Sequence, residues 1–228
     1  LLEVVKFIGT KYKNLDVIYH YSFYHQFHKN KNLSYQIFLN FLEVNKTFNK
    51  SNEVLLISGT KKRNKFEVLN VLEKLKFDLS KDIKFGVAFN PYFFEENDYK
   101  LERNRLIKKL NSFFVQSIWL QFGSEINQLV REINFLKKMI ADSQKLIDKD
   151  LSIYGSLFIP SKQFISRFKF RPWKGVYLSN KYLNSLEESA KITKFIIDFY
   201  SNNSIIPLVE TELSSEKQFI EAQNFINL

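Results

Sequence analysis

The segment from Phe85 to Phe122 constrains the fold most strongly, because it contains a complete strand–helix–strand pattern. Its first apolar run ends at Phe89 and is followed by a polar turn that contains a proline. The charged stretch 98–110 then places four apolar residues on one helical face: Leu101, Leu106, Ile107 and Leu110. A second apolar run, 115–122, closes the segment. Two apolar runs joined by an amphipathic helix predict a βαβ unit with parallel strands.

The rest of the chain repeats this unit at intervals of about 30 residues, which is the spacing of a repeated strand–helix fold. Apolar runs typical of strands begin near residues 17, 54, 83, 115, 152, 175 and 205, and a helical pattern follows each of them. One further strand upstream of Leu1 would give eight strands and eight helices. We therefore predict an α/β fold, a (β/α)8 TIM barrel with seven strands visible and the first strand missing upstream. The alternative is an open doubly wound sheet.

Composition narrows the class of protein. No linker rich in proline, glycine or serine divides the 228 residues, so we predict a single barrel domain over 1–228, incomplete at its N-terminus. The absence of cysteine excludes disulfides and thiol nucleophiles and makes the cytoplasm the expected location. The sequence contains no run of 18 uncharged apolar residues, so we predict no membrane-spanning segment. The net charge is +10, but 28 of the 34 basic residues are lysines spread along the chain, so we do not expect nucleic-acid binding. A homo-oligomer is left open.

In parallel α/β folds, the functional site lies at the carboxyl ends of the strands. The residues expected there are mostly amides, hydroxyls and aromatics: His20, Tyr21, Ser22, Ser58, Gly59, Thr60, Phe89, Asn90, Tyr92, Gln121, Pro160, Ser161, Ser179 and Glu210. This set suits a planar, hydrogen-bonding heterocycle better than hydrolytic chemistry, which needs paired carboxylates or a metal. Gln121 follows a buried run beside Trp119 and must find hydrogen-bond partners, and a ligand is one source of them.

Several of these features have simpler interpretations. His20 also suits a hydrogen-bonded histidine at the end of a strand, and its spacing to His25 and His28 matches no standard zinc motif, so we predict no metal. The basic cluster from Lys61 to Lys65 suits either a phosphate site or a solvated loop. Lys109 at a helix end complements the helix dipole. The segment RFKFRPWK, 167–174, lies between a helix and the next expected strand, where a structural or interaction role is expected.

Four segments together resemble the methylenetetrahydrofolate reductases, flavin-linked (β/α)8 barrels of folate metabolism. VLLISGT is similar to the family's strand that ends in Arg-Gly-Asp, and GVAFNPY to its strand that ends in an aromatic residue and a proline turn. KKLNSFFVQSIWLQF resembles the family's lysine-bearing helix and the strand with a Thr-Gln ending. SLFIPS is similar to a strand that ends in proline. The likeness follows strand order from about Val17 to Val209.

The resemblance implies an NADH- or NADPH-dependent oxidoreductase that passes hydride, through FAD where it is retained, to 5,10-methylenetetrahydrofolate. It implies that the flavin is contacted by six residues: His20, Ser58, Gly59, Thr60, Phe89 and Lys109. It implies that Gln121 hydrogen-bonds the pterin ring, and we place Asn90 with it at the substrate.

The chain departs from the family where Ser58 and Thr60 replace the arginine and the aspartate beside the flavin. The family's catalytic glutamate lies on its first strand, so the resemblance identifies no catalytic residue here. Two alternatives follow: a folate- or pterin-binding barrel without catalysis that acts as a partner subunit, and a barrel enzyme that uses Lys61 and Lys62 on a phosphorylated small molecule.

Overall fold

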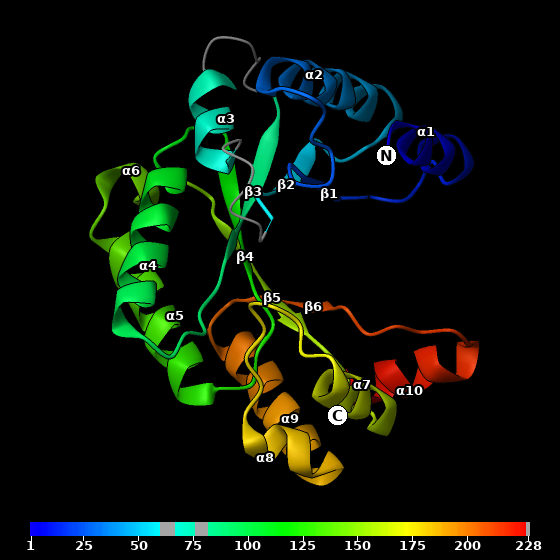
Figure 1. The fold of residues 1–228 in the computed structure, drawn as a ribbon, viewed down its shortest axis with the longest axis vertical. Helices are drawn as coiled ribbons and strands as arrows, with labels where there is room; N and C mark the ends of the chain where they lie inside the picture. Colours follow the sequence, from blue (N-terminus) through cyan, green and yellow to red (C-terminus); the bar gives the residue numbers. More distant parts are fainter. Residues whose placement is uncertain (60–66, 76–81, 227–228) are drawn as a thin grey trace. The chain divides into compact units, whose positions relative to one another are not determined.

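The computed structural model describes residues 1–59, 67–75 and 82–226, and strands and helices alternate along them (Figure 1). In chain order the elements are α1 (Leu2–Lys11), β1 (Tyr19–Ser22), α2 (Lys31–Phe48), β2 (Glu53–Ile57), α3 (Val68–Leu75), β3 (Lys84–Phe89), α4 (Glu96–Leu110), β4 (Val115–Leu120), α5 (Ile126–Ala141), α6 (Gln144–Ile147), β5 (Ser152–Leu157), α7 (Lys162–Phe170), α8 (Asn180–Asn184), α9 (Leu186–Asn202), β6 (Ile206–Val209) and α10 (Glu216–Ile226). The βαβ unit predicted over Phe85–Phe122 is confirmed as β3, α4 and β4.

The six strands form one sheet in the order β1-β2-β3-β4-β5-β6, so strands that are consecutive in sequence are neighbours in space. The pairs β1–β2, β2–β3, β4–β5 and β5–β6 are parallel. Hydrogen bonds from Phe85 N to Phe114 O (2.7 Å) and from Gln121 N to Phe89 O (2.8 Å) join β3 to β4 and its flanking residues. The carboxyl ends of the strands therefore lie along one edge of the sheet.

The predicted closed barrel is wrong, because this sheet is open with β1 and β6 at its two edges. The expected strand near residue 175 does not form and leaves only an isolated bridge between Gly123 and Tyr177. Pro172 has no N–H to offer a sheet, and Gly175 has a φ of 83°, so the segment turns where a strand would have to extend. The doubly wound alternative does not fit either, since the sequential strand order contains no reversal.

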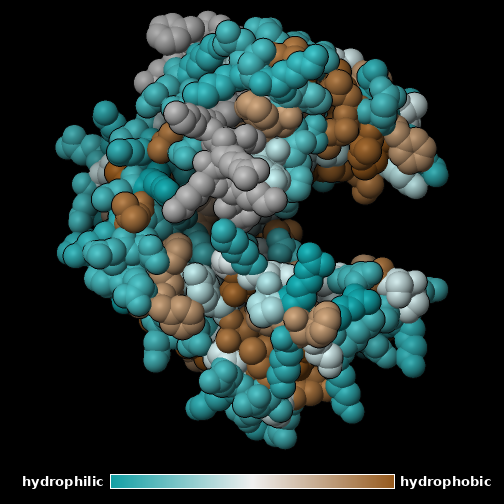
Figure 2. Space-filling view, in the orientation of Figure 1, coloured by the Kyte–Doolittle hydropathy of each residue, from teal (hydrophilic) through white to brown (hydrophobic). Residues whose placement is uncertain are grey.

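The chain divides into two compact units, one of Leu1–Ala88 with Arg105–Gln116 and one of Phe89–Asn104 with Ser117–Leu228. In the first unit, aromatic side chains of α2 pack on β1, with Phe38 and Phe41 both within 5 Å of the Tyr21 ring. Figure 2 shows hydrophilic side chains over the outer side of α2 and hydrophobic ones where α2 meets α1. The prediction of a single domain stays a prediction.

The second unit has its own aromatic core, in which Phe164 of α7 stacks on Phe158 at 5.1 Å and Trp173 packs against both rings. Trp173 therefore has the structural role expected for the segment 167–174. Phe170 in the same segment is 92% exposed. Among the residues that the structure describes, no helix combines the length and the apolar character needed to cross a membrane.

Candidate functional site

The carboxyl ends of β4, β5 and β6 bring several of the expected site residues into register. Trp119 on β4 is paired with Tyr154 on β5, and Ser156 on β5 is paired with Leu208 on β6. Since side chains alternate along a strand and paired residues share a face, Trp119, Tyr154 and Ser156 lie on the same face. Gln121 follows Trp119 by two residues, so the alternation places its side chain on this face too.

The opposite face of β5 is covered by α9. A Cβ atom added to Gly155 would lie only 2.3 Å from the Tyr200 ring, so glycine is required for this close approach. Tyr200 is fully buried, and its hydroxyl group donates a long hydrogen bond of 3.5 Å to the Ser156 carbonyl oxygen. The face that carries Trp119, Gln121 and Ser156 is therefore turned away from α9.

Two stacked aromatic rings lie on this face. The rings of Trp119 and Tyr154 have centroids 4.4 Å apart and planes inclined by 27°. The indole N–H of Trp119 donates a 2.8 Å hydrogen bond to Ser117 Oγ, which satisfies the one polar group of this buried side chain. The indole N–H of the stack is therefore already used within the protein.

The polar groups at the carboxyl end of this face differ in burial: Ser156 is buried, and Glu210 is exposed. Gln121 is half-buried, and no hydrogen bond among the described residues involves its side-chain amide. Glu210 follows β6, and its Oε1 accepts a 3.2 Å hydrogen bond from the Ser156 hydroxyl. Partial desolvation by the surrounding protein raises the pKa of the Glu210 carboxyl, and the Ser156 hydrogen bond opposes that rise. An amide, a hydroxyl and a carboxyl thus line the end of one sheet face.

In the first unit, Ser58 and Gly59 directly follow β2, but His20 is the second residue of β1 and does not lie at its carboxyl end as predicted. His20 is paired with Leu55, and desolvation by the surrounding protein lowers the pKa of its imidazole. Ser58 Oγ accepts a 3.2 Å hydrogen bond from Val68 N at the start of α3, so this hydroxyl is turned toward a helix. Gly59 has a φ of 87°, and a Cβ atom there would meet Tyr24 at 2.4 Å.

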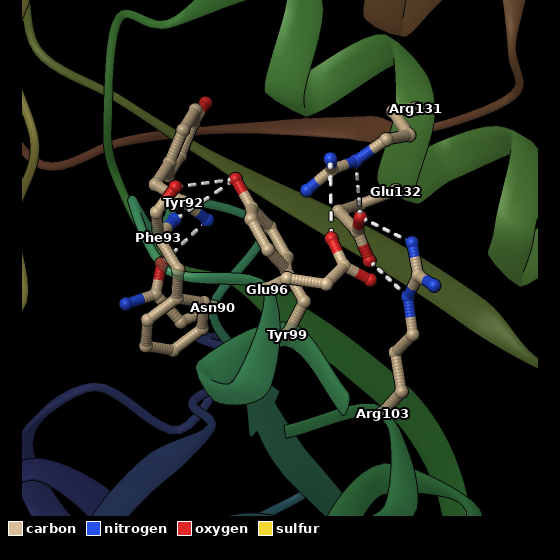
Figure 3. A network of polar contacts seen from close by, with 8 residues as sticks. All are labelled: Asn90, Tyr92, Phe93, Glu96, Tyr99, Arg103, Arg131 and Glu132. Atoms are coloured by element: carbon tan, nitrogen blue, oxygen red, sulfur yellow. Dashed lines mark hydrogen bonds and ion pairs between the residues drawn. The ribbon is translucent and has the colours of Figure 1, made fainter. Parts of the chain in front are cut away.

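Three further site candidates have contacts within the protein. Lys109 Nζ donates a 2.9 Å hydrogen bond to the Ala88 carbonyl oxygen. Phe89 is buried. Asn90 Oδ1 accepts a 3.0 Å hydrogen bond from Tyr92 N (Figure 3). Its Nδ2 donates a 3.0 Å hydrogen bond to Gly175 O. The Asn90 amide therefore uses both ends of its side chain to hold the turn after β3.

The predicted site residues are divided between the two units. His20, Ser58, Gly59 and Lys109 belong to the first unit, and Phe89, Asn90 and Gln121 belong to the second. Thr60 and the Lys61–Lys65 cluster lie outside the described residues. His25 and His28 are exposed, and within the described ranges no three His, Asp or Glu side chains gather as a metal site.

The sequence analysis missed a buried charged network in the second unit (Figure 3). Glu132 on α5 is fully buried and accepts hydrogen bonds from Arg103 Nε at 2.8 Å and Nη2 at 2.6 Å. Arg131 Nε also donates to Glu132 at 3.0 Å, and its guanidinium lies 3.7 Å from the centre of the Tyr99 ring. A signal was available, because Glu132 falls among the apolar positions Leu129, Ile133 and Leu136 of a helix.

Comparison with known proteins adds no family: no protein-family model matches the chain, and no curated protein matches it.

Proposed function

We propose that this protein is a methylenetetrahydrofolate reductase-like oxidoreductase, which transfers hydride from NADH or NADPH to 5,10-methylenetetrahydrofolate. The observation that carries the proposal is the Gln121 amide, which has no side-chain hydrogen bond among the described residues and adjoins the Trp119–Tyr154 stack. A pterin ring is planar and carries donors and acceptors side by side. An amide side chain has both a donor and an acceptor, so it can form hydrogen bonds with the edge of such a ring.

The location of the amide supports the same proposal. Gln121 follows β4 at the carboxyl end of a parallel sheet, where α/β folds bind their ligands. The Ser156 hydroxyl and the Glu210 carboxyl stand on the next two strands. This arrangement pairs an aromatic stack with a few convergent polar groups, as expected for the site of a small heterocyclic molecule.

The residues expected to hold FAD fit that cofactor only in part. Gly59 lies just after the carboxyl end of β2, where it could contact a flavin, but His20 lies within β1. The Ser58 hydroxyl, however, accepts a hydrogen bond from Val68 N, and the Lys109 ammonium donates to the Ala88 carbonyl. FAD, when bound, would relay hydride between nicotinamide and folate. The proposal requires only the net transfer, and FAD stays a prediction.

The test follows oxidation of NADH and of NADPH by the purified chain, with and without 5,10-methylenetetrahydrofolate. Folate binding is measured in parallel by quenching of tryptophan fluorescence, to which Trp119 contributes. We expect folate-dependent oxidation of one nucleotide. Gln121→Leu should weaken folate binding by about 10- to 100-fold, the loss of one or two hydrogen bonds from a ligand.

The control is Gln116→Leu, which makes the same change at the opposite end of β4 and should leave folate affinity within about twofold of wild type. Equal losses of folate affinity in the two variants would show that the Gln121 amide does not bind the ligand. Absence of folate-dependent oxidation of both nucleotides in the wild type would end the proposal.

A second candidate is a folate- or pterin-binding protein without catalysis. The observations that favour it are the Ser58 and Lys109 hydrogen bonds, which turn both groups toward the protein's own backbone. It predicts folate binding that depends on Gln121, with no oxidation of either nucleotide.

A further inference from the structure

Positive charge is concentrated in the part of the chain that contains α7 and the loop after it. Residues 151–186 include six basic residues and no acidic residue. Aspartate and glutamate make up 24 of the 228 residues, so a stretch of this length would ordinarily contain about four. Five of the six basic residues lie close together in the sequence: Lys162, Arg167, Lys169, Arg171 and Lys174. The lysine-rich composition of the chain does not account for this local absence of acidic residues.

The segment 167–174 also exposes aromatic side chains. Phe170, the last residue of α7, is 92% exposed, and no ring among the described residues packs against it. Trp173 is 43% exposed, although its ring also contacts the aromatic core of the second unit. Within the described ranges the indole N–H of Trp173 donates no hydrogen bond, in contrast to that of Trp119. An exposed phenyl ring and a partly exposed indole therefore stand among the basic residues.

Helical spacing places the exposed aromatic and basic side chains on one face of α7. Ile165 and Phe168 are the buried residues of this helix. Phe170 follows Arg167 by three residues, so the two side chains are neighbours on the face opposite the buried pair. Arg171 ends the helix, and its backbone N–H donates a 2.9 Å hydrogen bond to Arg167 O, which keeps it on the same side. The outer face of α7 thus presents Phe170 between two arginines.

The charges around Phe170 are only partly balanced within the protein. Arg167 pairs with Glu212 at 3.0 Å, but both side chains are exposed, and such pairs are weak. In the part of the chain that the structure describes, no carboxylate forms an ion pair with Lys169 or Arg171. Attraction to the dipole of α7 accounts for basic residues in its last turn, but not for Arg171 beyond it or for the exposure of Phe170. This surface is therefore complementary to an anionic partner that also offers an apolar environment.

We propose that the segment 167–174 binds the surface of an anionic lipid bilayer, an inference independent of the proposed function. Basic side chains are attracted to anionic headgroups, and an exposed aromatic side chain between them inserts at the boundary of the acyl chains. The indole of Trp173 has an apolar ring and an exposed polar N–H, the combination that is enriched at membrane interfaces. Binding of this kind is reversible and needs no helix that spans the membrane.

Single-stranded nucleic acid is the competing anionic partner. Proteins bind it with aromatic rings whose faces are open to successive bases. The ring of Trp173 is instead engaged by three phenylalanines of the core: Phe158, Phe164 and Phe168. Phe170 is then the open ring of this segment, and it protrudes between charged side chains. A single protruding apolar group favours insertion into lipid over stacking along a strand.

The experiment measures sedimentation of the full chain with vesicles of phosphatidylcholine alone and of phosphatidylcholine with about one-third phosphatidylglycerol. We expect binding to the anionic vesicles only. Phe170→Ala should weaken this binding about tenfold, because the inserted ring is lost. Arg171→Gln should weaken it about fivefold, the contribution of one basic residue near an anionic surface. Trp173→Phe should keep the affinity within about twofold of wild type but remove the blue shift of tryptophan fluorescence that vesicles cause, because Trp119 is buried.

The matched controls make the same changes on α10. Phe219→Ala removes a phenylalanine that is 51% exposed, and Lys217→Gln removes a lysine that pairs with Glu221 at 3.9 Å. Both should leave the affinity for anionic vesicles within about twofold of wild type, because neither residue belongs to the segment 167–174. The substituted side chains of Phe170 and Arg171 are exposed, so those variants should fold as wild type does.

Binding to anionic vesicles that weakens in Phe170→Ala and Arg171→Gln but not in the α10 variants supports the proposal. A wild type that does not bind anionic vesicles overturns it. Equal effects of the substitutions in the segment and on α10 also overturn it, because they would show attraction by net charge alone. Tight binding of a single-stranded oligonucleotide that depends on Phe170 would assign the segment to nucleic acid instead.

Discussion

At the scale of single residues, the buried ion pair between Arg103 and Glu132 should be a sensitive point of the second unit. Glu132 has no exposed surface, and Arg103 binds both of its oxygens. Removing one partner of a buried pair leaves an uncompensated charge, which costs about 3–5 kcal/mol. Arg131 still donates to Glu132, so we expect Arg103→Met to lower the free energy of unfolding by about 3 kcal/mol, the lower end of that range.

The measurement is urea unfolding followed by circular dichroism. The control is Arg167→Met, which removes an ion pair of similar length to Glu212, whose side chain is 83% exposed. An exposed pair contributes little, so this variant should change stability by less than about 1 kcal/mol. Similar losses in Arg103→Met and Arg167→Met would mean that burial of Glu132 does not control the energy of its pair.

At the scale of single elements, Ser185 sets the start of α9. Its hydroxyl accepts a 3.2 Å hydrogen bond from Glu188 N and separates α9 from the short α8. Loss of such a cap costs about 1 kcal/mol, so we expect Ser185→Ala to lower the free energy of unfolding by that amount. Ser185→Asp should retain most of it, because a carboxylate also caps a helix.

Thermal and urea unfolding of these variants would measure the effect. The control is Ser201→Ala near the end of α9, where alanine replaces an exposed serine in a helix and stability should stay within about 0.5 kcal/mol. A Ser185→Ala variant as stable as wild type would show that the cap does not hold the start of α9.

The helix α9 also shows which parts of the fold can be predicted from the sequence alone. The apolar spacing predicts one helix over Tyr182–Tyr200, and most of it forms, but Ser185 and Glu188 make an S-x-x-E pattern that begins a new helix. The expected strand near residue 175 fails for an equally local reason, the turn at Pro172 and Gly175. Barrel closure could not be predicted locally, because it depends on whether the two edge strands of the sheet meet.

The candidate site was predictable to a similar degree. Strand ends can be located from apolar runs, so Gln121 and Glu210 could be named from sequence. The direction of each side chain depends on register, since a shift of one residue reverses the face. Ser58 illustrates the limit: it follows β2 as expected, but its hydroxyl caps α3.

At the scale of the whole molecule, the net charge of +10 raises the question of polyanion binding. Charge alone gives weak, salt-dependent association with nucleic acid, with dissociation constants of about 10⁻⁴ to 10⁻⁶ M at physiological salt. Among the described residues the most exposed aromatic side chain is that of Phe170, which is 92% exposed and precedes Arg171, so a base could stack there beside positive charge. The prediction that nucleic acid is not a partner can therefore be tested at a defined position.

We expect a single-stranded oligonucleotide to bind in that weak range in fluorescence anisotropy at physiological salt, and to bind still more weakly as salt is raised. Phe170→Ala should leave the affinity within about twofold of wild type, because non-specific attraction needs no stacking platform. Phe219→Ala, which removes another exposed phenylalanine, is the matched control. A dissociation constant below about 10⁻⁷ M that weakens at least tenfold only in Phe170→Ala would contradict the prediction, since stacking of one base contributes about 1–3 kcal/mol. The segment 167–174 would then be a nucleic-acid site, and the positive charge would be part of the function.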